Sequence, residues 1–317
     1  MKEEKQIPFL SVLEQLFTAD PLPLELLYRL SDMSEADAAG FWAGWTAVAD
    51  ERRRVIVRHL ADISEENYVV DFLPVFAKTI NDPFAPVRIA SLDGLWDATN
   101  VMLIRPIIRL MQNDVDEEVR AAAAAALAHY VLLAEWNQIP VHLSPTIVEA
   151  LLAEYGKPET AVAVKRSALE AMGAANHPRV ASLIEEAYDS ADSDMQLSAV
   201  FAMGSSADPR WLPTIIGEMQ SPSENMRAEA ARAAGAIGGS DVVDALANLL
   251  MDEDLVVALA AVEALGQIGG DRPTELLQGL LDDSDFEDLH ETIEEVLEEM
   301  ALLSGDVDFD WLDVDED

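Results

Sequence analysis

An all-α solenoid of stacked antiparallel helix pairs is the fold class that this chain of 317 residues predicts. Four similar segments end at Gly173, Gly204, Gly235 and Gly266, so the sequence repeats at an interval of 31 residues. Each interval contains two stretches with apolar residues at helical spacing. Because one helix pair cannot bury its apolar face alone, the pairs are expected to stack into a continuous core.

The two helices of each pair differ in composition. The first is apolar at helical spacing, as in residues 73–80, and the second is rich in alanine, as in residues 121–126. Alanine favours helices and leaves no large side chain to hold a neighbour away, so the second helix is expected to be an inner helix packed on both sides. The repeating glycine falls in its last turn, where it allows close approach. Gly238 and Gly269 fit the left-handed position that ends a helix.

Two further columns of residues share this repeat. One column lies near the start of each second helix, with spacings of 32, 45, 31, 31 and 31, and contains Arg88, Arg120, Lys165, Gln196, Arg227 and Ala258. The spacing of 45 is one period with an insertion of 14 residues. The other column precedes these helices and is expected to cap them with short polar side chains, at Asp82, Asp114, Glu159, Ser190, Ser221, Asp252 and Asp283.

Residues 252–269, DEDLVVALAAVEALGQIG, show the whole pattern and resemble HEAT-like repeats. The period of 31 is similar to the short repeats of phycobilisome-lyase-like proteins. The resemblance covers roughly residues 66–300 and implies a right-handed, armadillo-like superhelix whose inner helices line a concave surface. It also implies a polar ladder between repeats, which Arg88, Arg120 and Arg227 match, and these three arginines are candidates for partner contact as well. Gln196 and Ala258 depart from that pattern, so we expect an incomplete ladder in the last third of the chain.

The repeat divides the chain into three parts. Residues 1–65 are expected to form an N-terminal helical cap, with a helix start at Ser34 and an aromatic group, Phe41, Trp42 and Trp45, buried against the first repeat. Residues 66–300 form the repeats, with an insertion near 130–145 and a capping repeat at 283–300. Residues 301–317 are an acidic and aromatic tail that we expect to be disordered alone.

Charge excludes several classes of partner. The chain carries 20 basic and 60 acidic residues, and residues 273–317 hold 18 acidic residues and no basic one. Such a field repels nucleic acids and anionic membranes, so we expect a partner that is a protein, with basic character as one option and mere solubility of the chain as the other. No run of about 18 apolar residues could span a bilayer. With no cysteine and no signal-peptide pattern, a cytoplasmic protein is expected.

Three segments are candidates for specific contacts. Arg52, Arg53, Arg54 and Arg58 form a basic cluster that is either a solvated helix face or a site for an acidic peptide. The insertion, with Trp136 and His142, either lengthens an inner helix or projects to touch a partner. The tail, with Phe309 and Trp311, is predicted to bind a foreign protein or the basic cluster of a second copy, because solvation alone needs no aromatic side chains.

No catalytic, metal-binding or cofactor-binding constellation is found in the sequence. Deoxyhypusine hydroxylase, a HEAT-like di-iron enzyme, needs several His-Glu pairs, and here only His290-Glu291 forms one. The sequence therefore favours a non-catalytic protein-interaction scaffold without a cofactor. The alternative is a lyase-like or chaperone-type protein that cups a small ligand or a chromophore-bearing partner, which requires an enclosed apolar pocket.

Overall fold

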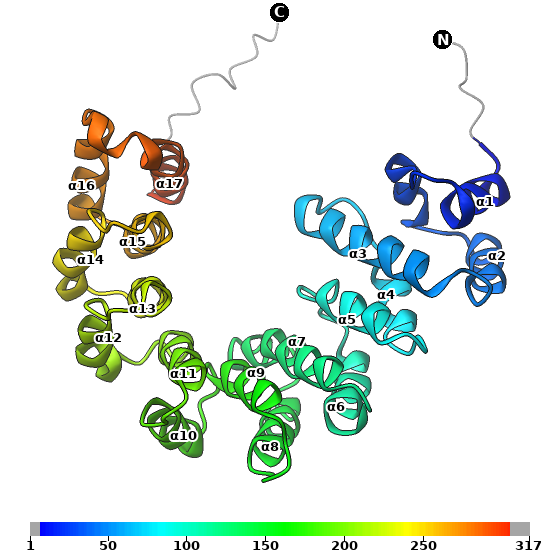
Figure 1. The fold of residues 1–317 in the computed structure, drawn as a ribbon, viewed down its shortest axis with the longest axis horizontal. Helices are drawn as coiled ribbons and strands as arrows, with labels where there is room; N and C mark the ends of the chain where they lie inside the picture. Colours follow the sequence, from blue (N-terminus) through cyan, green and yellow to red (C-terminus); the bar gives the residue numbers. More distant parts are fainter. Residues whose placement is uncertain (1–6, 305–317) are drawn as a thin grey trace, which may run out of the picture. The chain divides into compact units, whose positions relative to one another are not determined.

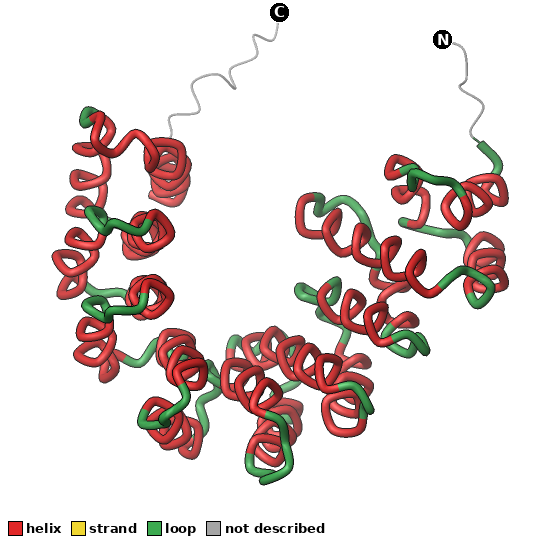
Figure 2. Tube along the Cα trace, in the orientation of Figure 1, coloured by secondary structure: helices red, strands yellow, loops and turns green. Residues whose placement is uncertain are grey.

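The computed structural model describes residues 7–304, and over this range the chain consists of helices and loops without a β-strand (Figures 1 and 2). The predicted all-α class is therefore confirmed. The chain divides into two compact units, residues 1–171 and residues 172–317.

The first unit begins with helices that precede the regular repeats and continues with helix pairs. Its elements are α1 (Phe9–Thr18), the 3₁₀ helix η1 (Leu24–Leu30), α2 (Glu35–Trp45), α3 (Asp50–Glu66), α4 (Leu73–Thr79), α5 (Ala85–Asp93), η2 (Val101–Leu103), α6 (Ile104–Asn113), α7 (Glu117–Glu135), α8 (Leu143–Tyr155) and α9 (Val162–Met172). Helix α5 contacts both α3 and α7, and α4 and α6 each pack against the helix that follows. Helices α3, α5 and α7 thus form the inner row of this unit.

The second unit is more regular. Its elements are α10 (Pro178–Tyr188), α11 (Ser193–Ser205), η3 (Pro209–Trp211), α12 (Leu212–Glu218), α13 (Glu224–Ile237), η4 (Ser240–Val242), α14 (Val243–Leu249), α15 (Leu255–Ile268), α16 (Asp271–Leu281), η5 (Ser284–Leu289) and α17 (His290–Ser304). Helices α11, α13, α15 and α17 contact one another in succession and form the inner row. Helices α10, α12, α14 and α16 form the outer row, each packed on the inner helix that follows it (Figure 1).

The repeating glycines lie where inner-row helices meet. A Cβ atom added to Gly204 would lie 2.7 Å from Cα of Ala233, and one added to Gly235 would lie 2.7 Å from Cα of Ala264. Real Cβ atoms do not approach this closely, so only glycine fits. The predicted role of the glycine column in close helix approach is confirmed. Gly238 and Gly269 have φ angles of 77° and 66°, and they end α13 and α15 as predicted.

The predicted caps are displaced by two residues. The side chains that accept hydrogen bonds from the first helical amides are those of Asp116, Asp192, Ser223 and Asp254, each two positions after a residue of the predicted capping column. In four described cases the column residue instead accepts a bond from the amide two residues later, as in Asp252 Oδ1 with the N–H of Asp254 at 3.0 Å. The capping prediction was therefore wrong by two residues. The column side chain accepts a hydrogen bond within the loop before the helix, and the residue two positions later caps the helix.

Two of the three aromatic residues near the N-terminus are buried as predicted. Phe41 and Trp45 are buried and their rings stack 5.0 Å apart, whereas Trp42 is half-buried with the Lys78 ammonium 4.3 Å from the centre of its ring. Helix α3 already belongs to the inner row because it packs on α5. The expected boundary at residue 65 therefore falls inside α3, next to its last residue.

The insertion forms part of α7, and one expected boundary shifts. The insertion lengthens α7 to 19 residues, which is one of the two options that the sequence left open, and a loop then leads to α8. Helix α17 runs to Ser304, four residues into the predicted tail. Phe309 and Trp311 lie outside the described residues.

Candidate functional site

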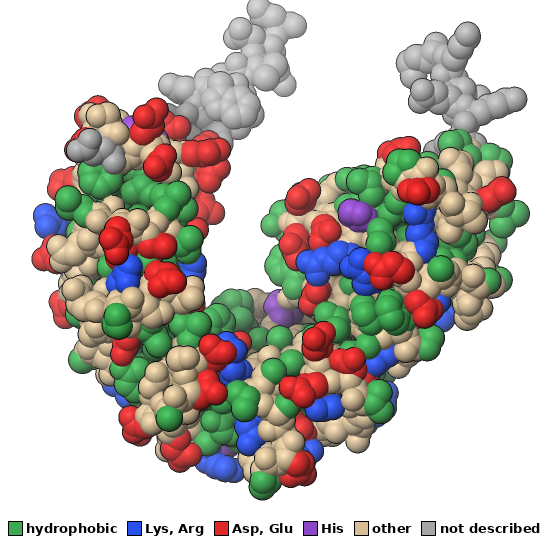
Figure 3. Space-filling view, viewed as in Figure 1, with side chains coloured by type: hydrophobic (Ala, Val, Ile, Leu, Met, Phe, Trp, Pro, Cys, Tyr) green, Lys and Arg blue, Asp and Glu red, His purple; other side chains and the backbone are tan. Residues whose placement is uncertain are grey.

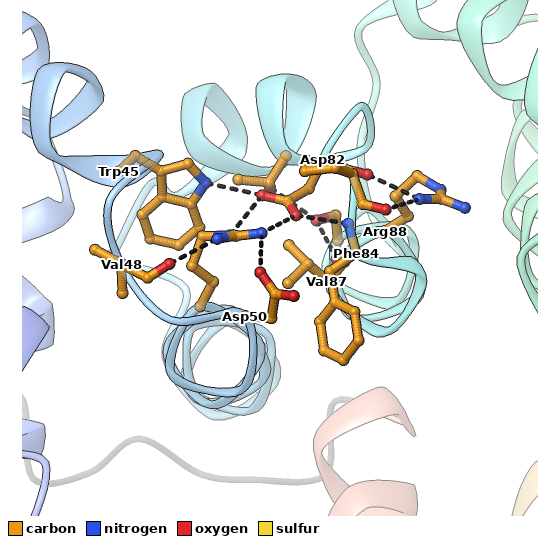
Figure 4. A network of polar contacts seen from close by, with 11 residues as sticks. Trp45, Val48, Asp50, Asp82, Phe84, Val87 and Arg88 are labelled. Atoms are coloured by element: carbon orange, nitrogen blue, oxygen red, sulfur yellow. Dashed lines mark hydrogen bonds and ion pairs between the residues drawn. The ribbon is translucent and has the colours of Figure 1, made fainter.

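A buried ion pair is the first link of a polar ladder along the edge of the first unit. Arg53, 4% exposed, donates from Nε and Nη2 to the two carboxylate oxygens of Asp82 at 3.0 and 2.9 Å. The indole Nε1 of Trp45 donates to the same carboxylate at 3.0 Å, so that Asp82 lies between α2, α3 and its own loop (Figure 4). Burial opposes the charge of Arg53, but the bonds and charges of Asp82 and Asp50 outweigh it and raise the pKa of Arg53.

The same arrangement recurs in later repeats. Arg88 donates to the backbone carbonyl of Asp82 at 2.8 Å and to the carboxylate of Asp114 at 2.7 Å. Arg120 donates to the carbonyl of Asp114 at 2.9 Å. In these repeats the arginine of the ladder therefore binds the backbone carbonyl six positions before it. Where two repeats are linked, it also binds the carboxylate of the next repeat.

In the second unit the link is bidentate. Arg227 donates to the carbonyl of Ser221 at 3.0 Å and to both oxygens of Asp252 at 2.7 and 2.8 Å. The hydrogen bond from Arg227 lowers the pKa of Asp252, and the bond to Asp252 raises the pKa of Arg227. Gln196 keeps the bond to the carbonyl six positions earlier, that of Ser190, at 2.8 Å. Ala258 has no polar side chain, so the ladder is incomplete where the sequence departs from the pattern.

These contacts engage several candidates for partner binding within the chain itself. Arg53, Arg88 and Arg227 join parts of this chain, and the side chains of Arg53 and Arg88 are 4% and 10% exposed. Arg120 is half-buried and donates to the backbone carbonyl of Asp114. The ladder is therefore a structural element, because guanidinium groups held in this way have few donors left for a partner.

The rest of the basic cluster is also engaged within the chain. Arg52 donates from Nε to the carbonyl of Leu16 at 2.7 Å, and Arg54 pairs with Glu51. Arg58 pairs with Asp62 at 3.0 Å and with Asp93 at 2.6 Å. Each of these cations thus has an acceptor in the chain, which weakens the case for an acidic peptide at this cluster.

The insertion presents a loop with one large exposed ring. Trp136 is 63% exposed, His142 is exposed, and both lie between α7 and α8. Within α7, Tyr130 is buried and donates its hydroxyl to the carbonyl of Asn100 at 3.1 Å, which ties this helix to the segment before η2. Burial raises the pKa of Tyr130 to about 12, so the hydroxyl stays a donor at physiological pH. Trp136 and His142 therefore remain available for a contact.

The inner row of the second unit carries a surface that sequence reasoning missed. Phe201, Arg232, Glu263 and Glu294 occupy one exposed position of α11, α13, α15 and α17 at intervals of 31 residues. Asp194 lies seven residues before Phe201, and Val256 lies seven before Glu263, so these pairs share one side of their helices. We call this surface the inner face, and it consists of Asp194, Phe201, Arg232, Val256, Glu263, Glu294 and Glu298. The register that revealed the repeat could have revealed this column.

The inner face combines acidic and apolar groups. Phe201 is 44% exposed and Val256 is 56% exposed, while the one basic member, Arg232, lies 3.6 Å from Glu229. Residues 172–317 contain 34 acidic and 5 basic side chains. On the visible side of the second unit, Figure 3 shows acidic groups bordering hydrophobic ones. The surface therefore suits a ligand with positive charge and some apolar area.

No group of three or more histidine, aspartate or glutamate side chains within residues 7–304 could hold a metal ion. In the same range no helix has the length and apolar character needed to cross a membrane.

The repeat geometry defines an α-helical repeat protein, and comparison with known proteins gives the kind of repeat. Residues 212–298 match the family described as HEAT repeats, so this part of the chain consists of HEAT-like helical repeats. No curated protein matches the sequence.

Several solved structures are similar to this chain at low sequence identity. Escherichia coli YibA is 17% identical with a TM-score of 0.41, over 71% of this chain and 92% of YibA. Human deoxyhypusine hydroxylase in complex with glycerol is 15% identical with a TM-score of 0.35, over 94% and 96% of the two chains. An engineered protein is 18% identical with a TM-score of 0.38, over 92% and 94%.

Proposed function

We propose that the chain is a non-catalytic scaffold that holds a basic, partly apolar segment of a partner protein on the inner face. The observation that carries the proposal is the exposed column of Phe201, Arg232, Glu263 and Glu294 on four consecutive inner helices. Its carboxylates attract a basic segment over a long range, and the exposed apolar side chains give it area to bury.

The sign of the proposed partner's charge follows from the second unit as a whole. With 34 acidic side chains against 5 arginines and no lysine, residues 172–317 repel an acidic ligand before contact. The basic cluster near the N-terminus offers no comparable positive surface, since its guanidinium groups already bind Leu16, Glu51, Asp82 and Asp93. A basic partner in the cytoplasm is therefore preferred to an acidic one.

Two more segments are proposed as secondary contacts. The exposed Trp136 and His142 of the insertion loop offer an aromatic contact on the first unit. The tail with Phe309 and Trp311 is proposed to touch a protein, either the same partner or a second copy of this chain.

The test uses two fluorescent peptides with alternating leucine, one arginine-rich and the other with glutamate in place of each arginine. Fluorescence anisotropy should show that the full chain binds the basic peptide and not the acidic one. Glu263→Lys and Glu294→Lys together should weaken binding at least tenfold, and Phe201→Ala should weaken it without changing the charge. The matched control is Glu185→Lys combined with Glu186→Lys on outer helix α10, where both glutamates are exposed.

An equal loss in the outer-row control would show that only the total charge matters, and the inner face would then not be the site. Phe309→Ala combined with Trp311→Ala, measured in the same assay and by light scattering, assigns the tail. A change in peptide affinity would mean that the tail contacts the partner. A smaller mass in solution would mean that the tail contacts a second copy of this chain.

A further inference from the structure

A pocket lies at the point where the ladder loses its arginine. It has a volume of about 390 Å³ and opens between the loop before α15 and the turn η5 before α17. Asp252, Glu253, Asp283 and Asp288 contribute acidic groups to its wall. The apolar part of the wall includes Leu255, Phe286 and Leu289, and Ala258 lies in the wall as well.

The ladder shows what this position holds in other repeats. Arg88 and Arg227 each bind the carbonyl six residues earlier and the column carboxylate of the next repeat. Ala258 occupies the same column, 31 residues after Arg227. The carbonyl six residues before Ala258 is that of Asp252, and the next column carboxylate is that of Asp283. Alanine offers neither of them a donor, so the pocket has the position and the lining of a missing arginine side chain.

A column carboxylate can take a guanidinium in addition to its bond within the loop. Oδ1 of Asp114 accepts the amide of Asp116 at 2.9 Å and Nη2 of Arg88 at 2.7 Å. Oδ1 of Asp252 likewise accepts the amide of Asp254 at 3.0 Å and Nη2 of Arg227 at 2.8 Å. Asp283 occupies the same column and lines the pocket.

We propose that this pocket binds an arginine side chain of the partner, which completes the ladder from outside. The inference rests on the proposed function for the positive charge of the partner and adds an anchor point away from the inner face. The planar guanidinium of that arginine lies among the acidic groups of the wall, while its methylene groups lie against Leu255 and Phe286. A lysine provides charge but lacks the fork that binds two oxygens at once.

The experiment uses N-acetyl-arginine methylamide as a probe of the full chain. Methyl resonances of Met251, Leu255 and Leu289 should shift on titration, and the neutral isostere N-acetyl-citrulline methylamide should shift them at least tenfold less. Asp288→Asn should weaken the arginine response, and Glu186→Gln on α10 should leave it unchanged.

Substitution of Ala258 separates this inference from the proposed function. Ala258→Arg should fill the pocket from inside, abolish the methyl shifts and raise the melting temperature, whereas Ala258→Leu should abolish the shifts without adding the ladder bonds. If the probe still shifts these methyl groups in Ala258→Arg, or if arginine and citrulline shift them equally in the parent, the arginine pocket is refuted. Those outcomes leave peptide binding to the inner face untouched, because neither Glu263 nor Glu294 lines the pocket.

Discussion

At the scale of single residues, burial separates side chains that look alike in the sequence. Arg52, Arg53 and Arg54 are consecutive, yet Arg53 is buried against Asp82 while the side chain of Arg54 is 38% exposed. A helix turns about 100° per residue, so neighbours in the sequence point to different sides. The composition of the cluster predicted positive charge, but only the packing of α2 and α3 shows which of the three is structural.

Substitution of Arg53 and Arg54 by methionine should have very different effects. Arg53→Met leaves the buried carboxylate of Asp82 without its cation, and we expect a loss of about 3–5 kcal/mol in unfolding free energy. Adding Asp82→Asn removes the buried charge while keeping an acceptor for Trp45, so the double variant should be less destabilised than the sum of the two single variants. Urea unfolding measures both quantities.

Arg54→Met is the matched control, and its unfolding midpoint should stay close to that of the parent, since an exposed pair contributes little. Equal effects at the two arginines would contradict the buried link.

At the scale of elements, helix order and stacking could be predicted from the sequence because they depend on periodicity alone. The helix start at Ser34, whose side chain accepts from the amide of Asp37, followed from local chemistry. The start of the inner row at α3 could not be predicted in the same way. Arg53 binds Asp82, 29 residues later, but the next arginine of the ladder, Arg88, lies 35 residues after Arg53 and thus outside the repeat spacing. The Ala258 pocket was equally hidden, since a missing side chain leaves a cavity only where the surrounding loops do not close.

Substitution of glycine by alanine should have opposite effects on the unfolding free energy in the inner and outer rows. In Gly235→Ala the new methyl group meets Ala264 and Gln267 within 2.8 Å, so unfolding free energy should fall by about 1–3 kcal/mol. Gly217 in α12 has no atom within 4 Å of its added Cβ, and Gly217→Ala should gain about 0.5–1 kcal/mol from helix propensity. Thermal unfolding followed by circular dichroism measures both changes. If Gly235→Ala were more stable than the parent, the inner helices would have to move apart without any loss of unfolding free energy.

At the scale of the whole molecule, charge is the dominant property. The formal net charge of −40 divides into −29 for residues 172–317 and −11 for residues 1–171, so most of the repulsion lies within the second unit. This repulsion opposes folding while it keeps copies apart and favours oppositely charged ligands. The same numbers offered a basic partner as one option and solubility as the other, but they could not predict the inner face, which depends on which side of each helix stays uncovered.

Salt should therefore stabilise this protein. Raising the ionic strength from about 0.01 M to about 0.15 M shortens the screening length from about 30 Å to about 8 Å and weakens repulsion between like charges. We expect the melting temperature, measured by differential scanning fluorimetry, to rise with the concentration of sodium chloride. A non-ionic solute of equal osmolality is the control. A fall in melting temperature would show that attractive pairs such as Arg227 with Asp252 outweigh the repulsion.

The short reach of the cross-repeat links bears on how this chain is made. Arg53 with Asp82, Arg88 with Asp114 and Arg227 with Asp252 are 29, 26 and 25 residues apart, and Gly204 meets Ala233 at a separation of 29. Contacts of such low sequence separation form quickly and need no distant partner. On the ribosome, each inner helix can dock as soon as the next repeat has emerged, so structure can grow at the pace of translation with little apolar surface waiting for a remote segment.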